Sequence, residues 1–521
     1  MTSGVAGALQ RTLFTDVYVY DADLPEGMRG PTDLLIVGNR VEVIGVDARR
    51  VYEIGCNHNQ TAGRTIDGQS RMLVAPGLIN AHFHSPANHL KGSLRSLPLE
   101  LFMLFESPTD AELTPTPREA YLRTMLAALE MLRTGTTTVQ DDAFLMPFPT
   151  PEILDAVMQA YADCGIRASV ALDQPELREA DKLPVQTSHH ADFGVALHTP
   201  APMDAAGLLE MYNYLITTWH GANEGRLRAA VSISAPQRVS PAYFEALDDL
   251  SRIHNIPLFA HMLETKLQRT LSNTQPRFAG RSLVEYTAEL GLLTERMNVI
   301  HAVWVDDKDL ELIGSAGAVI VHNPVSNLRL GSGVAPFRRF KDHGIITALG
   351  VDEAICDDSC NMWGVVKMAG LIHNISGVDS DEWPTGKEIL SSLWSGGAAA
   401  LLQSHQLGAV REGYLADLVV LDLHSRSFTP FNDLCGQLVY CEGGDSVILT
   451  MVDGRIVFED GVVCTVDESA LLVEAREIFA QKLPAIRRAR HQASALFPHY
   501  QALVREAAAT DVGFNRWIQT P

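Results

Sequence analysis

Eight apolar, strand-like runs that alternate with longer amphipathic segments constrain the fold of this chain most strongly. The runs are LVAPGLINAHFH (73–84), GTTTVQDD (135–142), GIRASVALD (165–173), LRAAVSISAP (227–236), IPLFAHML (256–263), MNVIHAVWV (297–305), GAVIVHNP (317–324) and IITALGVDE (345–353). Helical patterns lie between several of them, at residues 116–135, 241–255, 282–296 and 306–317. Strands buried on both faces read as continuous apolar blocks, and eight strand–helix units close a (β/α)8 barrel. We therefore predict an α/β fold with a TIM barrel over residues 73–407.

Composition and charge exclude several classes of partner. The 521 residues are 46% hydrophobic and 20% charged, close to the average for globular proteins, so a large core is available. The formal net charge of −22 would repel nucleic-acid phosphates and anionic lipids, because such binding begins with a basic surface. We expect neither partner. The N-terminus lacks the features of a secretory signal and no run is long enough to cross a bilayer, which indicates a cytoplasmic protein.

The two ends of the chain have a common pattern that differs from the barrel region. Short β-branched runs occur at residues 13–21, 33–46, 50–55, 416–423 and 447–463. Two of these runs contain turn signals, Gly-Asn in the first half of the chain and Asp-Gly in the second. We predict that residues 1–72 and 408–465 form one small β-domain and that residues 466–521 form a helical extension. Residues 174–200 are either a lid or a solvated insertion.

Polar side chains that can bind a metal follow the predicted barrel strands. His82 and His84 end the first strand, and alternate residues of a strand point to the same face, so the two imidazoles can share one metal ion. His261 and Glu264 end the fifth strand, His301 the sixth and Asp352 the eighth. Active-site groups of such barrels lie at these carboxyl ends. Three imidazoles and a carboxylate are a ligand set typical of Zn²⁺ or Fe²⁺.

Two of these residues have plain structural alternatives. His301 could be a buried histidine that hydrogen-bonds a backbone carbonyl. Glu264 could be a carboxylate at the start of a surface helix, where the helix dipole favours it. The coincidence of the whole set at successive strand ends favours a metal site over these alternatives.

The chain resembles a known family. The resemblance lies in PGLINAHFH, GTTTVQDD, HMLE, VIHAVWVDDKDL, NPVSNLRLGSGVAPF, ALGVDEA and LGAVREGYLADLVVLDL, which together span most of the sequence. These segments are similar to the amidohydrolase superfamily, in the branch of cytosine, S-adenosylhomocysteine and guanine deaminases and triazine hydrolases, including atrazine chlorohydrolase. The resemblance implies a barrel beside a composite β-sandwich made from both termini.

The resemblance also implies roles for the strand-end residues. His82, His84, His261 and Asp352 would be the metal ligands. Glu264 would be the acid/base beside the leaving group, and His301 would hold the hydrolytic water or the substrate, with Asp352 also accepting a proton. Binuclear members carry a carboxylated lysine at the end of the fourth strand, and LRAAVSISAPQRV has no lysine. We therefore expect one divalent ion, Zn²⁺, with Fe²⁺ as the alternative.

The function expected from the resemblance is hydrolysis of a small molecule. The leading hypothesis is a mononuclear metal-dependent hydrolase that deaminates a nitrogen-rich heterocycle, or removes a halide from it, with a metal-activated water. The alternative is hydrolysis of a urea, carbamate or cyclic amide C–N bond. A non-catalytic scaffold is a third hypothesis, against which the complete ligand set argues. Homo-oligomerisation, as a dimer or a larger assembly, is expected from the resemblance alone.

Several neighbouring residues keep two interpretations. Glu353, after the eighth strand, stands where relatives commonly have a small or amide residue, and it either contacts a cationic substrate group or turns away from the site. Ser326 and Asn327 either contact the substrate or form a turn. The apolar residues of the first loop either line a pocket or fill a helix core; they are Leu101, Phe102, Leu104 and Phe105.

Overall fold

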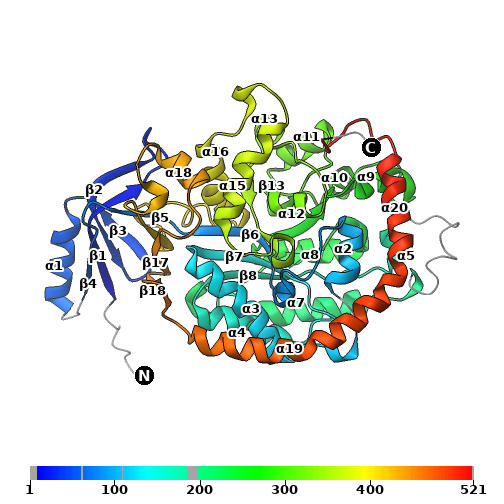
Figure 1. The fold of residues 1–521 in the computed structure, drawn as a ribbon, viewed down its shortest axis with the longest axis horizontal. Coiled ribbons are helices and arrows are strands. Elements are labelled where there is room, and N and C mark those ends of the chain that lie inside the picture. The colour runs from blue at the N-terminus through cyan, green and yellow to red at the C-terminus, as the bar shows by residue number, and fades with distance from the viewer. Residues whose placement is uncertain (1–8, 60–62, 108–109, 185–196, 519–521) are drawn as a thin grey trace.

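The protein is a barrel with a β-sheet domain at one side and two long helices wrapped around the other (Figure 1). The computed structural model describes residues 9–59, 63–107, 110–184 and 197–518. Within these ranges, no helix is long and apolar enough to cross a membrane.

The eight predicted strands form the barrel. They are β6 (Leu78–His84), β7 (Thr136–Ala143), β8 (Arg167–Leu172), β9 (Leu227–Ala229) with β10 (Val231–Ser232), β11 (Leu258–Met262), β12 (Met297–His301), β13 (Val319–His322) and β14 (Thr347–Leu349) with β15 (Asp352–Glu353). All neighbours pair in parallel, in the two orders β15-β6-β7-β8-β9 and β10-β11-β12-β13-β14. Because only Ala230 separates β9 from β10 and only residues 350–351 separate β14 from β15, the two halves close into one barrel.

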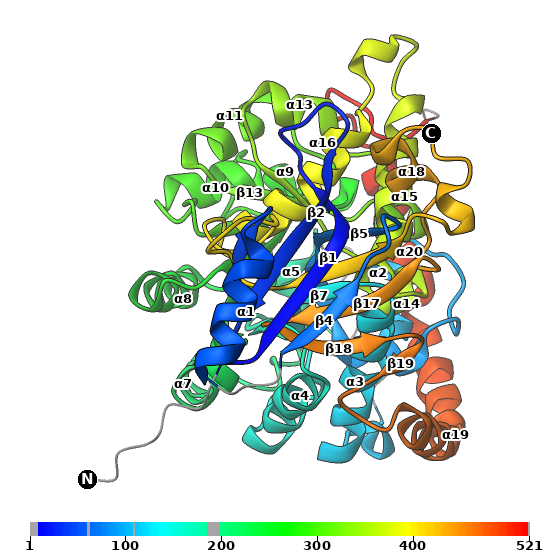
Figure 2. The ribbon, with the colours of Figure 1, turned by 90° about the vertical axis from the view of Figure 1, so that its left-hand side faces the viewer.

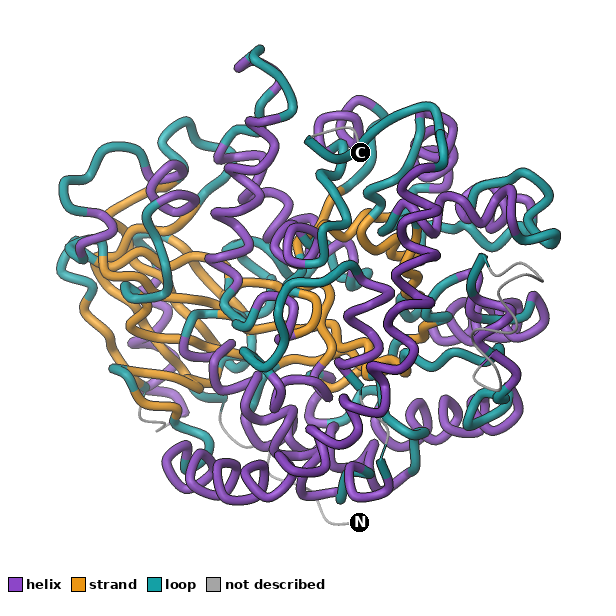
Figure 3. The backbone as a smooth tube through the Cα atoms, turned by 45° about the vertical axis from the view of Figure 1, so that its right-hand side comes forward, coloured by secondary structure: helices purple, strands orange, loops and turns teal. Residues whose placement is uncertain are grey.

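Helices cover the outside of the barrel, as Figure 3 shows. The main ones are α3 (Pro117–Arg133), α4 (Pro151–Cys164), α7 (Ala205–Trp219), α8 (Pro241–His254), α10 (Leu283–Glu289), α11 (Asp307–Ala316) and α15 (Met362–Ile372). Helix α3 starts at a capping box, in which the Thr116 and Glu119 side chains each bind the backbone N–H of the other. Helix α11 starts at a similar box and ends at Gly317, whose φ of 70° suits glycine. Polar caps thus set where these helices begin and end.

Shorter helices lie in the segments that follow the barrel strands. They are α2 (Leu99–Glu106), α5 (Glu179–Lys182), α9 (Lys266–Thr274), α12 (Pro324–Arg329), α13 (Phe337–Asp342), α14 (Ala354–Asp357), α16 (Gly386–Ser391) and α17 (Gly397–Ala400). Inside the barrel, a cluster of apolar side chains from most of the strands fills the interior, including Phe259, Ile300 and Val321. The barrel is therefore a packed core with its loops gathered at one end.

Strands from both termini form a second sheet. Its order is β19-β18-β17-β16-β5-β1-β2-β3, and β4 pairs with β1. The strands are β1 (Arg11–Tyr20), β2 (Met28–Val37), β3 (Arg40–Ile44), β4 (Arg64–Asp67), β5 (Met72–Pro76), β16 (Leu418–Asp422), β17 (Val447–Val452), β18 (Arg455–Glu459) and β19 (Val462–Val463), with α18 (Leu434–Tyr440) between β16 and β17. The antiparallel pair β5–β16 joins the N-terminal strands to the C-terminal ones. The predicted fold class, a TIM barrel beside a β-sandwich made from both termini, is confirmed.

One predicted strand is wrong. Residues 50–55 lie in helix α1 (Ala48–Asn59), which covers the outer face of the terminal sheet (Figure 2). Ala48, Val51 and Tyr52 pack against β1 and β2 in one apolar cluster. Their spacing of three and four residues is that of a helix face. The run was too short for its β-branched content to distinguish a strand from a helix.

The C-terminal extension is helical and lies against the barrel. Helix α19 (Glu468–Ala493) runs past α3, and α20 (Phe497–Ala509) packs beside α2 and α9 (Figure 1). The Arg490 guanidinium donates a hydrogen bond to the Phe105 carbonyl at 3.0 Å, and Lys482 forms an ion pair with Glu119 at 2.9 Å. The extension therefore supports α2 from behind. The exact division of the chain into domains stays a prediction.

Candidate active site

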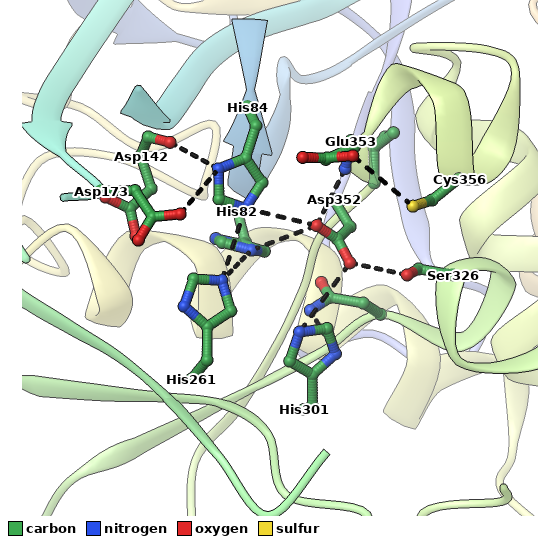
Figure 4. A network of polar contacts seen from close by, with 12 residues as sticks. His82, His84, Asp142, Asp173, His261, His301, Ser326, Asp352, Glu353 and Cys356 are labelled. Carbon is green, nitrogen blue, oxygen red and sulfur yellow. Dashed lines mark hydrogen bonds and ion pairs between the residues drawn. The ribbon is translucent and has the colours of Figure 1, made fainter. Parts of the chain in front are cut away.

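Four predicted ligand residues converge at the carboxyl end of the barrel (Figure 4). His82 and His84 come from β6, His261 from β11 and Asp352 from β15, and all four are buried. His261 Nε2 lies 3.2 Å from His82 Nε2 and 3.4 Å from His84 Nε2. Asp352 Oδ1 lies 3.4 Å from the Nε2 atoms of both His82 and His84.

These separations match the donors of a single metal ion. Bonds of about 2.0–2.1 Å to a tetrahedral ion place neighbouring donor atoms about 3.3 Å apart. The measured distances of 3.2–3.4 Å agree with that value. Three imidazole nitrogens and one carboxylate oxygen also form a donor set that Zn²⁺ and Fe²⁺ accept. The residues therefore fit the metal that the sequence predicts.

Backbone carbonyls orient two of the imidazole rings. His261 Nδ1 lies 2.7 Å from the Ser234 carbonyl, and His84 Nδ1 contacts the Asp142 carbonyl. A ring that donates its Nδ1 hydrogen keeps a free lone pair on Nε2, which is the atom that faces the centre. Burial, followed by the neighbouring imidazoles, holds the pKa of His261 well below its usual value. The ring is therefore neutral and available as a ligand.

Asp352 has different partners for its two oxygens. Oδ1 faces His82 and His84, while Oδ2 accepts a hydrogen bond from Ser326 Oγ at 2.6 Å. Burial raises the pKa of Asp352, but the hydrogen bond with His82 and the surrounding imidazoles outweigh that effect and hold the pKa well below its usual value. The carboxylate is ionised, as a ligand requires.

Glu264 and His301 lie beside this centre. His301 Nε2 is 3.6 Å from Glu264 Oε2 and 3.8 Å from Asp352 Oδ2, and its Nδ1 lies 2.9 Å from Asn327 Oδ1. Burial lowers the pKa of His301 to about 4. Burial, together with the charges of Asp352 and Glu100, raises the pKa of Glu264 well above its usual value. His301 is thus a neutral imidazole at neutral pH, and burial favours the protonated form of Glu264.

Backbone strain gathers at the same strand ends. Ser234, Leu263, His301 and Asp352 have φ values of 59°, 53°, 73° and 71°, in the left-handed region that non-glycine residues rarely adopt. Such residues cost of order 1–3 kcal/mol each and cluster at functional sites. At His301 and Asp352, the strained backbone carries side chains of the centre itself.

A cavity of about 300 Å³ opens next to the candidate metal centre. His84, His261, Glu264, His301 and Asp352 line one part of it. Apolar side chains form another part; they are Phe102, Leu104, Phe144 and Met146.

Both interpretations of the apolar first-loop residues, pocket lining and helix core, therefore apply, but to different residues. Phe102 and Leu104 line the cavity, whereas Leu101 packs with Tyr500 and Phe105 lies against Phe497. Helix α2 is thus both a wall of the cavity and part of the core beneath α20.

Sequence reasoning missed several polar groups of this cavity. Glu106, Asp173, Gln237 and Arg238 line it, and Ser332 Oγ lies 3.4 Å from Glu264 Oε1. Asp173 follows β8, so the strand-end rule that found the histidines could have found it. Glu106 ends a mostly apolar helix and carried no comparable signal.

Other histidines and cysteines of this region lie outside the four-donor cluster. His89 Nδ1 contacts the Pro86 carbonyl, and Cys356 lines the cavity with its Sγ 3.9 Å from Glu353 Oε2. His189 and His190, with residues 185–196 of the possible lid, lie outside the described residues.

Comparison with known proteins places the chain in a family. The profile described as "Amidohydrolase family" matches residues 73–457, which is most of the chain. The chain belongs to the amidohydrolase family. The predicted membership, as a hydrolytic enzyme of the deaminase branch, is confirmed.

Curated relatives of this amidohydrolase are deaminases. It is 33% identical over 407 residues to a 5-methylthioadenosine/S-adenosylhomocysteine deaminase of Nitratidesulfovibrio vulgaris, covering 78% of this chain and 84% of the relative. It is 28% identical over 433 residues to a 5'-deoxyadenosine deaminase of Methanosarcina mazei, covering 83% and 91%.

Solved structures share the fold of this amidohydrolase. An adenosine deaminase from Xanthomonas campestris with bound zinc superposes with a TM-score of 0.75 at 23% identity, over 92% of this chain and 98% of that one. Atrazine chlorohydrolase from Arthrobacter aurescens, complexed with zinc, gives a TM-score of 0.78 at 23% identity, over 89% and 99%.

Proposed function

We propose that this amidohydrolase removes an amino group from a carbon of a nitrogen-rich heterocycle by hydrolysis, with one divalent ion held by His82, His84, His261 and Asp352. The observation that carries the proposal is a cluster of four donor residues in which His82 and His84 each lie 3.2–3.4 Å from His261 and from Asp352, beside an acid–imidazole pair in a cavity. Zn²⁺ is the proposed ion, and Fe²⁺ is the alternative.

The residues around the centre divide the chemistry between them. A bound divalent ion supplies Lewis acidity and lowers the pKa of a coordinated water towards neutrality. Asp352 accepts the proton of the attacking water. Glu264, whose pKa is raised by burial, gives a proton to the departing nitrogen. His301 is neutral and presents Nε2 between Glu264 and Asp352, where it holds the water or the substrate in line.

The proposal of a single ion is supported by what the fourth barrel strand lacks. Residues 227–239 contain no lysine that could be carboxylated to bridge a second ion. Ser232 and Ser234 occupy that strand end instead, and Ser232 Oγ donates to Asp142 Oδ2 at 2.9 Å.

The substrates of the relatives and the lining of the cavity together support a proposal for the leaving group. The curated relatives act on adenosine-type compounds and one structural neighbour is a chlorohydrolase, so an amine or a halide on an aromatic ring is the proposed leaving group. The aromatic side chains of Phe102 and Phe144 in the cavity lining suit such a ring. A small-molecule substrate, a cytoplasmic location and a homo-oligomeric state are proposed with it.

The test is product analysis across a panel of aminopyrimidines, purines, triazines, ureas and cyclic amides, with the metal content of the enzyme measured in parallel. Release of ammonia, amine or halide from an intact ring is the expected result. An opened ring or a split chain would instead support hydrolysis of a urea, carbamate or cyclic amide.

A further inference from the structure

Two buried carboxyl groups meet in the cavity beside the candidate metal centre. Glu106, at the end of α2, and Glu353, directly after Asp352, share a side-chain hydrogen bond, and both line the cavity. Asp173 lines it as well, and its Oδ2 lies 3.7 Å from His84 Nδ1. Figure 4 shows Asp173 and Glu353 close to the His84 ring. Three acidic side chains thus gather at one part of the cavity.

None of these three carboxyl groups has a cationic partner among Lys and Arg in the described parts of the chain. Two cations do line the cavity, but they are engaged elsewhere. Lys182 forms an ion pair with Glu179, and Arg238 donates hydrogen bonds to Ser234 Oγ and Met103 Sδ. The acidic groups therefore face the cavity without a Lys or Arg partner.

The same cavity presents buried acceptors with no donor. Asp173 Oδ1 and Gln237 Oε1 have no hydrogen-bond partner, although the two residues are only 6% and 3% exposed. A buried acceptor left without a donor is destabilising, and so is a buried carboxylate without a cation. Unpartnered acceptors beside carboxyl groups that have no Lys or Arg partner suit a ligand that brings N–H donors and positive charge.

We propose that the substrate carries a cationic nitrogen group, such as an amidinium, a guanidinium or a protonated amine, and that Glu106 and Glu353 bind it. This group is separate from the leaving group, which faces Glu264. Its N–H donors bind the carboxyl oxygens in charge-assisted hydrogen bonds, and Asp173 Oδ1 accepts a further one. The apolar wall of Phe102, Leu104 and Phe144 holds the ring between the two ends.

The inference rests on the proposed function only for the position of the reacting carbon. A cationic probe that binds without being hydrolysed can therefore test the inference separately from catalysis. Isothermal titration of the metal-loaded enzyme compares benzamidine, which is a cation at neutral pH, with its neutral isostere benzamide. We expect benzamidine to bind at least about tenfold more tightly, as one or more charge-assisted hydrogen bonds provide. Because two carboxyl groups that share a hydrogen bond hold one proton between them, only the double variant Glu106→Gln/Glu353→Gln removes the negative charge of the pair while keeping the side-chain shape, and it should abolish most of this preference.

Glu179→Gln is the matched control. Glu179 lines the same cavity, but it is paired with Lys182 and accepts a hydrogen bond from Tyr500 Oη at 2.7 Å. This variant removes the same charge and should leave the preference for benzamidine unchanged. Melting temperature and metal content are measured for every variant, so a misfolded protein or a lost ion is recognised.

The outcomes separate the inference from the proposed function. A benzamidine preference that depends on Glu106 and Glu353 supports the inference, even if no heterocycle in the panel is hydrolysed. Equal binding of the two probes, no binding of benzamidine, or an equal loss of preference in Glu179→Gln would overturn it, even in an enzyme that deaminates its substrate.

Discussion

The two carboxylate oxygens of Asp352 have different partners in this site. Its Oδ1 belongs to the candidate metal centre, whereas its Oδ2 faces Ser326 and His301. The carboxylate can therefore bind an ion and receive a proton on different oxygens. Ser326 fixes the rotation of the carboxylate on which both functions depend.

Replacing Ser326 by alanine tests that positioning. Without the 2.6 Å hydrogen bond, Asp352 can rotate, so we expect Ser326→Ala to lower metal affinity or activity by about 10–100-fold, as loss of such supporting contacts does. Competition with a chelator measures the affinity. Ser395→Ala, at an exposed position, is the control, and an unchanged affinity in Ser326→Ala would contradict the role.

Glu264→Gln separates proton transfer from metal binding. Glu264 lies next to His301 rather than among the four clustered donors. We therefore expect the variant to keep its metal and to lose activity by about 10²–10⁴-fold, the contribution typical of a general acid or base. Elemental analysis and single-turnover kinetics together decide the result. Loss of the ion with the activity would show that Glu264 acts as a ligand.

The histidines and Asp352 could be predicted because strand ends fix their position. Alternation along β6 turns His82 and His84 to one centre whatever the loops do. Ser326 could not be assigned in the same way, since the hydroxyl of a serine just after a strand can bind either its own turn or a neighbouring side chain. Glu106 could not be predicted for another reason. Its carboxyl group meets Glu353 only through the tertiary packing of α2, which the sequence does not show.

At the scale of elements, one cluster of charged side chains joins helices α13 and α16. Glu388 in α16 accepts a hydrogen bond from Arg338 Nη1 of α13 at 3.0 Å and contacts Lys341 of the same helix. It also completes the capping box of α16 with Thr385. Burial raises its pKa, but the bonds with Arg338, Lys341 and Thr385 outweigh that effect and lower the pKa from 4.5 to about 2.

This shift gives a pH-dependent prediction for Glu388→Gln. Because the folded pKa is below the unfolded one, the ionised side chain stabilises the fold above about pH 4.5, and this is lost as the pH falls towards 2. We expect the variant to be less stable by about 1 kcal/mol or less at pH 7, since the pair is partly exposed and screened. Urea unfolding of the wild type and the variant at several pH values measures the difference in unfolding free energy. A difference that grows as the pH falls would contradict the lowered pKa of Glu388.

The barrel strands were predictable at this scale, but α1 was not. Continuous apolar runs bounded by glycine or proline describe a buried parallel strand well. Residues 50–55 are half-exposed and short, so their β-branched side chains suggested a strand until Ala48, Val51 and Tyr52 were seen on one helical face. The long C-terminal helices were expected as helices, but their contact with α2 depends on tertiary packing.

At the scale of the whole molecule, a buried cluster joins the barrel to the terminal sheet. Arg167 of β8 binds Asp417 in two hydrogen bonds, at 2.7 and 3.0 Å, and Asp453 in a third at 3.0 Å. Asp417 precedes β16 and Asp453 follows β17, so one guanidinium links the two sheets.

Arg167→Met should therefore destabilise the entire protein. The change leaves two buried carboxylates without their cation, for which about 3–5 kcal/mol is expected. Denaturant unfolding measures the loss, with Arg455→Met as a control, since Arg455 pairs with Glu224 at an exposed position. A loss as small as that of the control would show that the two sheets are held by other contacts.

The measurement that tests the central claim most directly is metal content by elemental analysis, on the purified protein and on His82→Ala and Asp352→Asn. We predict about one Zn or Fe per chain, which both variants lose together with the hydrolytic activity. A protein that holds no metal, and that gains neither metal nor activity when Zn²⁺, Fe²⁺, Mn²⁺ or Co²⁺ is supplied, would contradict the account.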